Sequence, residues 1–136
     1  MSTETPLLAI QQYIDAFNRA DTGAMAATFD VTGQILDGLP PHAWQGPTAT
    51  LDWYNDVMME SEILGATDYF VTIGDPLHNN ATKDRAYVVV PATMSFDFKG
   101  TKVEQSGAFF TVALRKTVDG WRIVSWAWTK GANKNQ

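Results

Sequence analysis

The residues best suited to chemistry lie in one short stretch, from Gln34 to Gly46. Asp37 closes a short apolar run there, and a Gly-Leu-Pro-Pro segment that opposes regular structure follows it. His42 and Trp44 come next, so one stiff loop holds a carboxylate, an imidazole and an indole. Carboxylates and imidazoles commonly take up and release protons in catalysis. An ordinary turn also explains this stretch, because Asp before Gly is a frequent turn former.

The elements that position this stretch follow from hydrophobic periodicity. Apolar residues at helical spacing predict helices at about residues 5–20, 22–29 and 48–63. Ile35 and Leu36 are predicted to form a short strand. From residue 67 the period changes to two, which predicts strands at 67–74, 85–98, 102–116 and 121–130. Residues 30–33, residues 75–80 and the chain after 130 are predicted to lack regular structure.

This order of elements predicts an α+β fold in a single domain that spans residues 1–136. Three N-terminal helices are expected to pack on one face of a strongly curved, mostly antiparallel sheet. Strands this long must bend because strand twist accumulates along them. Pro91 and Gly107 are the predicted bend points, since Pro interrupts a ladder and Gly permits a bulge.

Composition argues against several functional classes. The net charge is −5 and the basic residues are scattered, which argues against nucleic acid as a partner. The chain has no Cys, so disulfides and thiolate chemistry are excluded, and two isolated His residues argue against a metal site. We expect no cofactor. The N-terminus has no secretory pattern and no apolar run is long enough to span a bilayer, so we expect no membrane partner and a cytoplasmic location.

Three positions, Tyr13, Asp37 and Tyr54, carry a resemblance to a known family. Tyr13 stands in Gln-Tyr-Ile-Asp-Ala-Phe-Asn, Tyr54 follows a Trp, and Ser-Phe-Asp-Phe-Lys-Gly at 95–100 matches a further hairpin. The layout resembles the nuclear transport factor 2-like superfamily, which has a cone-shaped, cystatin-like fold and includes the SnoaL-like proteins. Within that superfamily it is most similar to the bacterial ketosteroid isomerases.

The resemblance implies a catalytic role for each of the three positions. Asp37 falls where the isomerases hold their base, Tyr13 where a tyrosine donates a hydrogen bond to the steroid oxygen, and Tyr54 where a second tyrosine supports the first. One position departs from the pattern. Phe109 stands where the isomerases carry a protonated aspartic acid as their second donor to the oxyanion. Losing one such donor typically lowers a rate by about 10²–10³-fold.

Strand alternation and the resemblance together predict an aromatic pocket for a small apolar molecule. The residues expected to face inward come from three strands. They are Ala92, Met94 and Phe96, then Gln105, Gly107, Phe109 and Thr111, and then Trp126, Trp128 and Lys130. The predicted substrate-binding residues are Phe17, His42, Trp44, Met58, Met94, Phe96, Phe109, Trp126 and Trp128.

The outer face of the sheet is expected to be apolar too. The residues predicted there are Tyr87, Val89, Phe110, Val112, Leu114 and Ile123. Large exposed apolar patches are rare on monomers, so we expect a homodimer formed through this face.

Two functional hypotheses stay open from the sequence. The first is a SnoaL-like, ketosteroid isomerase-like enzyme without a cofactor, in which Asp37 moves a proton on a bound apolar or polycyclic molecule. The second is a ligand-binding or protein-docking module that uses the same fold without chemistry, which Phe109 favours. The structural alternative is that the aromatic side chains fill the core and leave no pocket.

Overall fold

The computed structural model describes residues 3–133 of the chain. The helices are α1 (Pro6–Asn18), α2 (Thr22–Ala27) and α3 (Ala49–Leu64). The strands are β1 (Phe29–Leu36), β2 (Ala43–Gln45), β3 (Ala66–Ile73), β4 (His78–Ala81), β5 (Arg85–Phe98), β6 (Thr101–Thr117), β7 (Gly120–Thr129) and β8 (Ala132–Asn133). None of the helices within residues 3–133 is long and apolar enough to cross a membrane.

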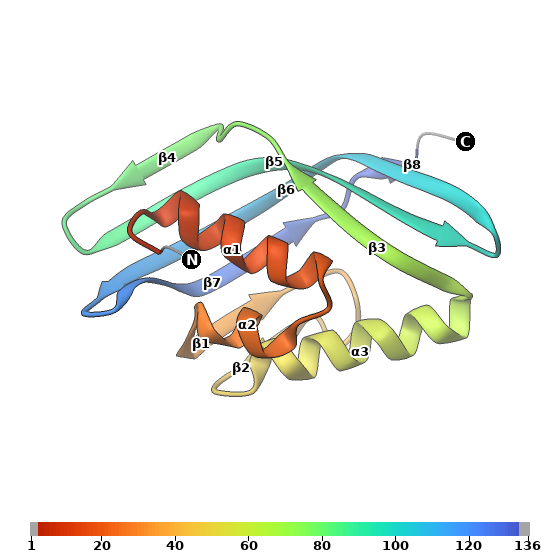
Figure 1. Cartoon of the computed structure of the whole chain (residues 1–136), viewed down its shortest axis with the longest axis horizontal. Helices are drawn as coiled ribbons and strands as arrows, with labels where there is room; N and C mark the ends of the chain where they lie inside the picture. The colour runs from red at the N-terminus through yellow and green to blue at the C-terminus, as the bar shows by residue number, and fades with distance from the viewer. Residues whose placement is uncertain (1–2, 134–136) are drawn as a thin grey trace.

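The strands form one mixed, curved sheet in the order β2-β1-β7-β6-β5-β3. β4 pairs with β5, and β8 pairs with β6. The β1–β7 pair is parallel and the other pairs are antiparallel. Figure 1 shows α1 crossing one face of this sheet and α3 running beside β1 and β2. The fold is therefore α+β, as the sequence predicts.

Local signals explain where the helices begin and end. The Thr5 side chain accepts a hydrogen bond from the Leu8 amide and caps α1, whose first residue is Pro6. Asp21 caps α2 in the same way. Gly65, with φ of 81°, ends α3 in the left-handed conformation that glycine adopts without strain. These caps are visible in the sequence, and α1 and α3 lie close to their predicted bounds.

Short polar strands are where the predictions fail. Residues 30–33, expected to form a turn, belong to β1, and the segment expected to be a loop around Trp44 contains β2. β4 and β8 also lie in stretches predicted to be irregular. All four residues of β4 are exposed and polar or small, so no alternation of apolar residues marks it.

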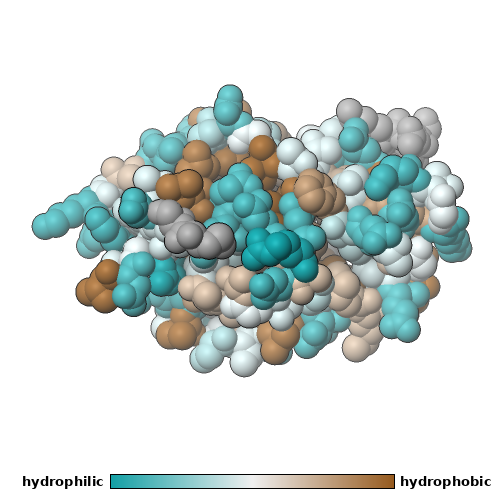
Figure 2. Space-filling view, viewed as in Figure 1, coloured by the Kyte–Doolittle hydropathy of each residue, from teal (hydrophilic) through white to brown (hydrophobic). Residues whose placement is uncertain are grey.

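The core lies between the helices and the sheet. Ile10, Tyr13 and Met25 of the helices are buried against Phe110 and Trp126 of the strands. On the face that carries α1, apolar residues occur only in small groups between polar ones (Figure 2). The chain thus buries most of its large apolar side chains on the helix-facing side of the sheet.

Two β-bulges correct the predicted facing of β6 and β7. Between Gln105 and Ala108, β6 has two residues opposite the single Thr93 of β5, and the extra residue is Gly107, with φ of 78°. The strict alternation reverses there, so Phe110 is buried and Phe109 is 37% exposed.

The same reversal moves other residues assigned to the outer face. Val112 and Leu114, which follow the β6 bulge, are buried in the core. In β7, an extra residue at Val124 brings Ile123 inward as well. Tyr87 remains on the outer face, 49% exposed, and Phe109 joins it. The outer face is therefore less apolar than predicted.

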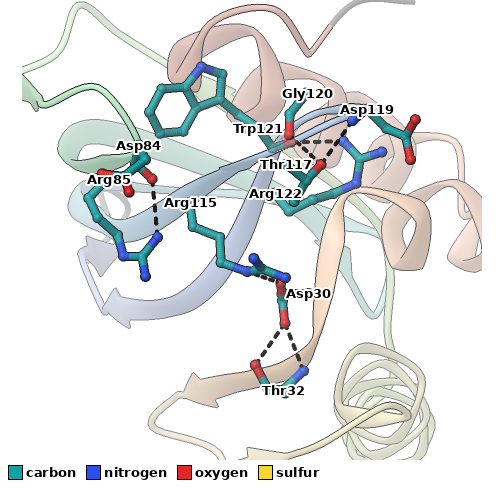
Figure 3. Close-up of polar contacts among 10 residues, drawn as sticks. All are labelled: Asp30, Thr32, Asp84, Arg85, Arg115, Thr117, Asp119, Gly120, Trp121 and Arg122. Atoms are coloured by element: carbon teal, nitrogen blue, oxygen red, sulfur yellow. Dashed lines mark hydrogen bonds and ion pairs between the residues drawn. The ribbon is translucent and has the colours of Figure 1, made fainter.

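An ion pair ties β1 to β6 near the C-terminal end of β6 (Figure 3). The Asp30 side chain is 3% exposed, and its Oδ2 accepts a hydrogen bond of 2.5 Å from Arg115 Nε. Its Oδ1 accepts from the backbone and hydroxyl groups of Thr32. Burial acts to raise the pKa of Asp30, but the bonds from Thr32 and the bond and charge of Arg115 outweigh it and lower the pKa.

We predict that Arg115→Met destabilises the fold by about 1–2 kcal/mol at neutral pH, since Arg115 is partly exposed to screening solvent. A carboxylate with a lowered folded pKa stabilises fully above its unfolded pKa, about 3.9. That stabilisation is lost as pH falls through the folded pKa. Urea unfolding at pH 7 and pH 3 measures this difference. Arg85→Met is the control, because Arg85 lies opposite Arg115 and its guanidinium bonds to a backbone carbonyl, that of Asp84, rather than to a carboxylate. Equal losses at both pH values would contradict the prediction.

Candidate functional site

A cavity of about 550 Å³ lies between the helices and the sheet. Its buried inner wall includes Tyr13, Met25, Phe110 and Trp126. Exposed residues mark its mouth: Gly38, Pro40, Glu60, Leu64, Phe98 and Lys130. The aromatic side chains therefore do not fill the core completely, and they leave a space the size of a small-molecule site.

Asp37 lies in the wall of this cavity, immediately after β1, and is half-buried. Its Oδ2 accepts a hydrogen bond of 2.8 Å from the indole Nε1 of Trp53 on α3. Its Oδ1 accepts one of 2.8 Å from the Gly38 amide. Both oxygens of the carboxylate are thus held in place by donors. Asp37 takes part in a turn and also lines the cavity, so the two interpretations of the stretch are compatible.

Tyr13 of α1 also lines the cavity, with its hydroxyl inside a buried network. Trp126 Nε1 donates to the Tyr13 hydroxyl at 2.9 Å, and the Thr50 hydroxyl lies 3.0 Å from it. Burial raises the pKa of the Tyr13 phenol, and the two hydrogen bonds oppose this only in part. Tyr13 is therefore a neutral phenol near pH 7. It has one hydrogen, so it can donate to a ligand only when Thr50 donates to Tyr13.

Tyr54 does not hold the position that the resemblance implies. Its ring packs on Phe17 and Trp53, and it lines a second, smaller cavity of about 410 Å³. Thr50, one helical turn earlier on α3, makes the contact with Tyr13 that was expected of Tyr54. A hydroxyl in place of a phenol is a less acidic donor to Tyr13.

The predicted substrate-binding residues divide into two groups. Phe17, Met94, Phe96, Trp126 and Trp128 line the cavity. Four others lie outside it. His42 is exposed in the loop after Asp37, and Trp44 is buried on β2 with its Nε1 bonded to Asp56. Met58 lines the second cavity, and Phe109 faces outward beyond the bulge.

Several cavity residues were not predicted from the sequence. Ser61 and Tyr69 are joined through their hydroxyls at 2.7 Å and line both cavities, so this pair forms part of the wall between them. Trp53 supports Asp37. A signal for the α3 residues was present, because Thr50, Trp53 and Ser61 recur at spacings that share one helix face.

Comparisons with known proteins agree with this architecture. A family model described as a SnoaL-like domain matches residues 8–128. The chain belongs to the SnoaL-like family. This membership confirms the resemblance to the nuclear transport factor 2-like superfamily. No sequence among the curated proteins matches this SnoaL-like chain significantly.

Solved structures resemble the SnoaL-like chain at low sequence identity. A ketosteroid isomerase-like protein from Erwinia carotovora atroseptica SCRI1043 is 22% identical over 90% of this chain and 91% of its own, with a TM-score of 0.68. The hexachlorocyclohexane dehydrochlorinase LinA-type3 from Novosphingobium barchaimii LL02 is 12% identical over 95% and 88%, with a TM-score of 0.77. A protein with a cystatin-like fold from Nostoc punctiforme PCC 73102 is 12% identical over 91% and 86%, with a TM-score of 0.67. At these identities the likeness shows a shared fold.

The polar groups of the SnoaL-like cavity are few, and their hydrogen bonds limit what each can do. The cavity offers a carboxylate held by two donors beside an apolar, aromatic space. The indole N–H groups of Trp53 and Trp126 are already bonded to Asp37 and Tyr13, so neither is free to stabilise a developing oxyanion. Phe109 and Phe110 are both apolar, so neither supplies the missing acid, whichever of them faces inward.

Proposed function

We propose that this SnoaL-like chain binds a small apolar or polycyclic molecule in the cavity, and that Asp37 removes a proton from a carbon of that molecule. The observation that carries this proposal is the Asp37 carboxylate in the wall of an aromatic cavity, oriented by the Trp53 indole. A carboxylate in such surroundings is a suitable base for a proton next to a carbonyl. The solved structures whose names denote ketosteroid isomerase-like and dehydrochlorinase proteins support it by analogy of fold.

The test offers the protein a Δ5-3-ketosteroid and follows the absorbance of the conjugated enone. A second assay is independent of the exact product, because it follows incorporation of deuterium from heavy water at the carbon next to the carbonyl. We expect slow turnover, since the missing oxyanion donor lowers the rate by about 10²–10³-fold. If a ketone binds but forms no conjugated enone and incorporates no deuterium, the proposed chemistry is contradicted.

A second candidate is a ligand-binding or protein-docking module without catalysis. The observation that favours it is the Tyr13 hydroxyl, whose partners Trp126 and Thr50 compete with any ligand. A ligand that binds only the folded state stabilises it, by about 2.7 kcal/mol at a hundred times its Kd. Such stabilisation without proton exchange would favour this candidate over the enzyme.

We also propose a homodimer formed through the outer face of the sheet. Tyr87 and Phe109 are exposed there, and they flank smaller side chains at Val89, Thr111 and Ala113. Sedimentation at micromolar concentration should give the mass of two chains. The Phe109→Asp variant should sediment with the mass of one chain. A monomer at that concentration would contradict the proposal. The cytoplasmic location stays a prediction from the sequence.

A further inference from the structure

Gln105 of β6 is a buried polar residue in the cavity wall that the proposed chemistry does not use. The residue is only 6% exposed, and its side chain lines the cavity. Its Oε1 is buried and has no hydrogen-bond partner among residues 3–133. A buried polar atom without a partner destabilises a fold, so most such atoms in proteins are bonded.

The other polar side chains of the buried wall differ from Gln105 in this respect. Asp37 accepts from Trp53 and Gly38, and Tyr13 is bonded to Trp126 and Thr50. Ser61 and Tyr69 bond to each other. Glu60 and Lys130 lie at the mouth and are exposed to solvent. Within the described part of the chain, Gln105 is thus the buried lining group that still needs a partner.

The backbone holds Gln105 in this position. The bulge at Gly107 lies between Gln105 and Ala108, and it lets both residues face the cavity side of β6. Bulges often re-aim a side chain in this way near functional sites. Without the bulge, an inward Gln105 would bring Phe109 inward and turn Phe110 out.

Gln105 and Asp37 line the cavity from different strands of the sheet. Asp37 follows β1 and Gln105 is on β6, with β7 between these strands in the sheet. Asp37 follows Leu36 and is level with Phe110 of β6, and Gln105 lies about four residue rises from Phe110, beyond the bulge. With strands about 4.8 Å apart and a rise of about 3.3 Å per residue, the two backbone positions are roughly 16 Å apart. The two side chains extend from these positions and shorten the span that a fused ring system has to bridge.

We propose that Gln105 selects ligands that carry a hydroxyl group, which its carboxamide binds away from the carbon that faces Asp37. The ligand class is then a hydroxylated, otherwise apolar ring compound. A hydroxyl satisfies Oε1 as a donor, and rotation of the carboxamide also lets it accept from Nε2. This inference rests on the proposed binding in the cavity and is independent of proton removal by Asp37.

The test compares 2-naphthol with 2-methoxynaphthalene, which has similar size but no hydroxyl hydrogen. Binding is followed by quenching of the tryptophan fluorescence, because Trp53, Trp126 and Trp128 line the cavity. We expect the protein to bind the naphthol roughly 2- to 10-fold more tightly, the range for one neutral hydrogen bond. Gln105→Met, which is similar in volume, should abolish that preference, as should Gln105→Leu.

Gln12→Met is the matched control. Gln12 Oε1 is likewise buried without a partner in the described structure, but Gln12 does not line the cavity. This variant should keep the preference for the naphthol, and circular dichroism checks that each variant folds. An unchanged preference in both folded Gln105 variants overturns the inference while leaving the proposed binding intact. If neither probe quenches the fluorescence, both the inference and the proposed binding fail. Asp37→Asn should keep the preference even if it removes activity.

Discussion

Replacing Asp37 with asparagine is expected to lower the proposed rate of proton removal by about 10²–10⁴-fold, the usual contribution of a positioned general base. Asparagine has the same size and keeps an oxygen that can accept from the Trp53 indole, while its NH2 group gives up the bond from the Gly38 amide. The neutral amide, however, cannot take the proton. The measurement is deuterium incorporation into a bound ketone, with enone absorbance where a Δ5-3-ketosteroid is turned over.

The chain contains a matched control for this experiment. Asp56 of α3 accepts a hydrogen bond of 2.9 Å from the Trp44 indole, much as Asp37 does from Trp53, but it lies outside the cavity. Asp56→Asn therefore removes a carboxylate of the same kind without touching the site, and its rate should equal that of the unaltered protein. Full activity in Asp37→Asn, or equal losses in both variants, would rule out Asp37 as the base.

Trp126→Ala is expected to destabilise the fold by about 3–5 kcal/mol, the usual cost of truncating a buried Trp. Trp126 is 3% exposed, and its ring packs against Trp53 and Phe110 at centroid distances of 5.0 and 5.2 Å. Its indole also donates to Tyr13, so truncation both opens a hole and removes a hydrogen bond inside the core. Urea unfolding measures the loss.

Two further variants separate packing from hydrogen bonding at this position. Trp126→Phe retains an aromatic ring and loses the bond to Tyr13, so it should cost less than Trp126→Ala. Trp128→Ala truncates a half-buried Trp that lines the cavity and packs against the Phe110 ring. It should lower the free energy of unfolding by less than either Trp126 variant. An unfolding midpoint for Trp126→Ala equal to that of the unaltered protein would show that the network does not stabilise the fold.

The sequence predicts the long elements of this fold well because their signals are local. The β5 strand has its predicted bounds, Arg85–Phe98, and α3 differs from its prediction by one residue at each end. β2 and β4 escaped prediction because strands of three or four residues, most of them exposed, carry too little periodicity. Their pairing partners, β1 and β5, hold them in strand conformation.

The site was harder to predict because it depends on which way side chains face. Asp37 was found as a carboxylate between a strand and a stiff loop, and the structure adds Trp53 as the group that orients it. The sequence does not show that Thr50, rather than Tyr54, contacts the Tyr13 hydroxyl, because the two residues lie one turn apart on the same helix. Phe109 and Phe110 are identical in type, so composition gives no sign of which one faces the cavity.

The Gly107 bulge also determines how β6 must be aligned with the same strand in related proteins. Relatives that lack the extra residue require a one-residue gap at Gly107, and relatives that share it require none. An ungapped alignment with the first kind would pair every surface position after 107 with a cavity position. The apparent substitutions in that half of the strand would then reflect the misplaced gap rather than a change in ligand.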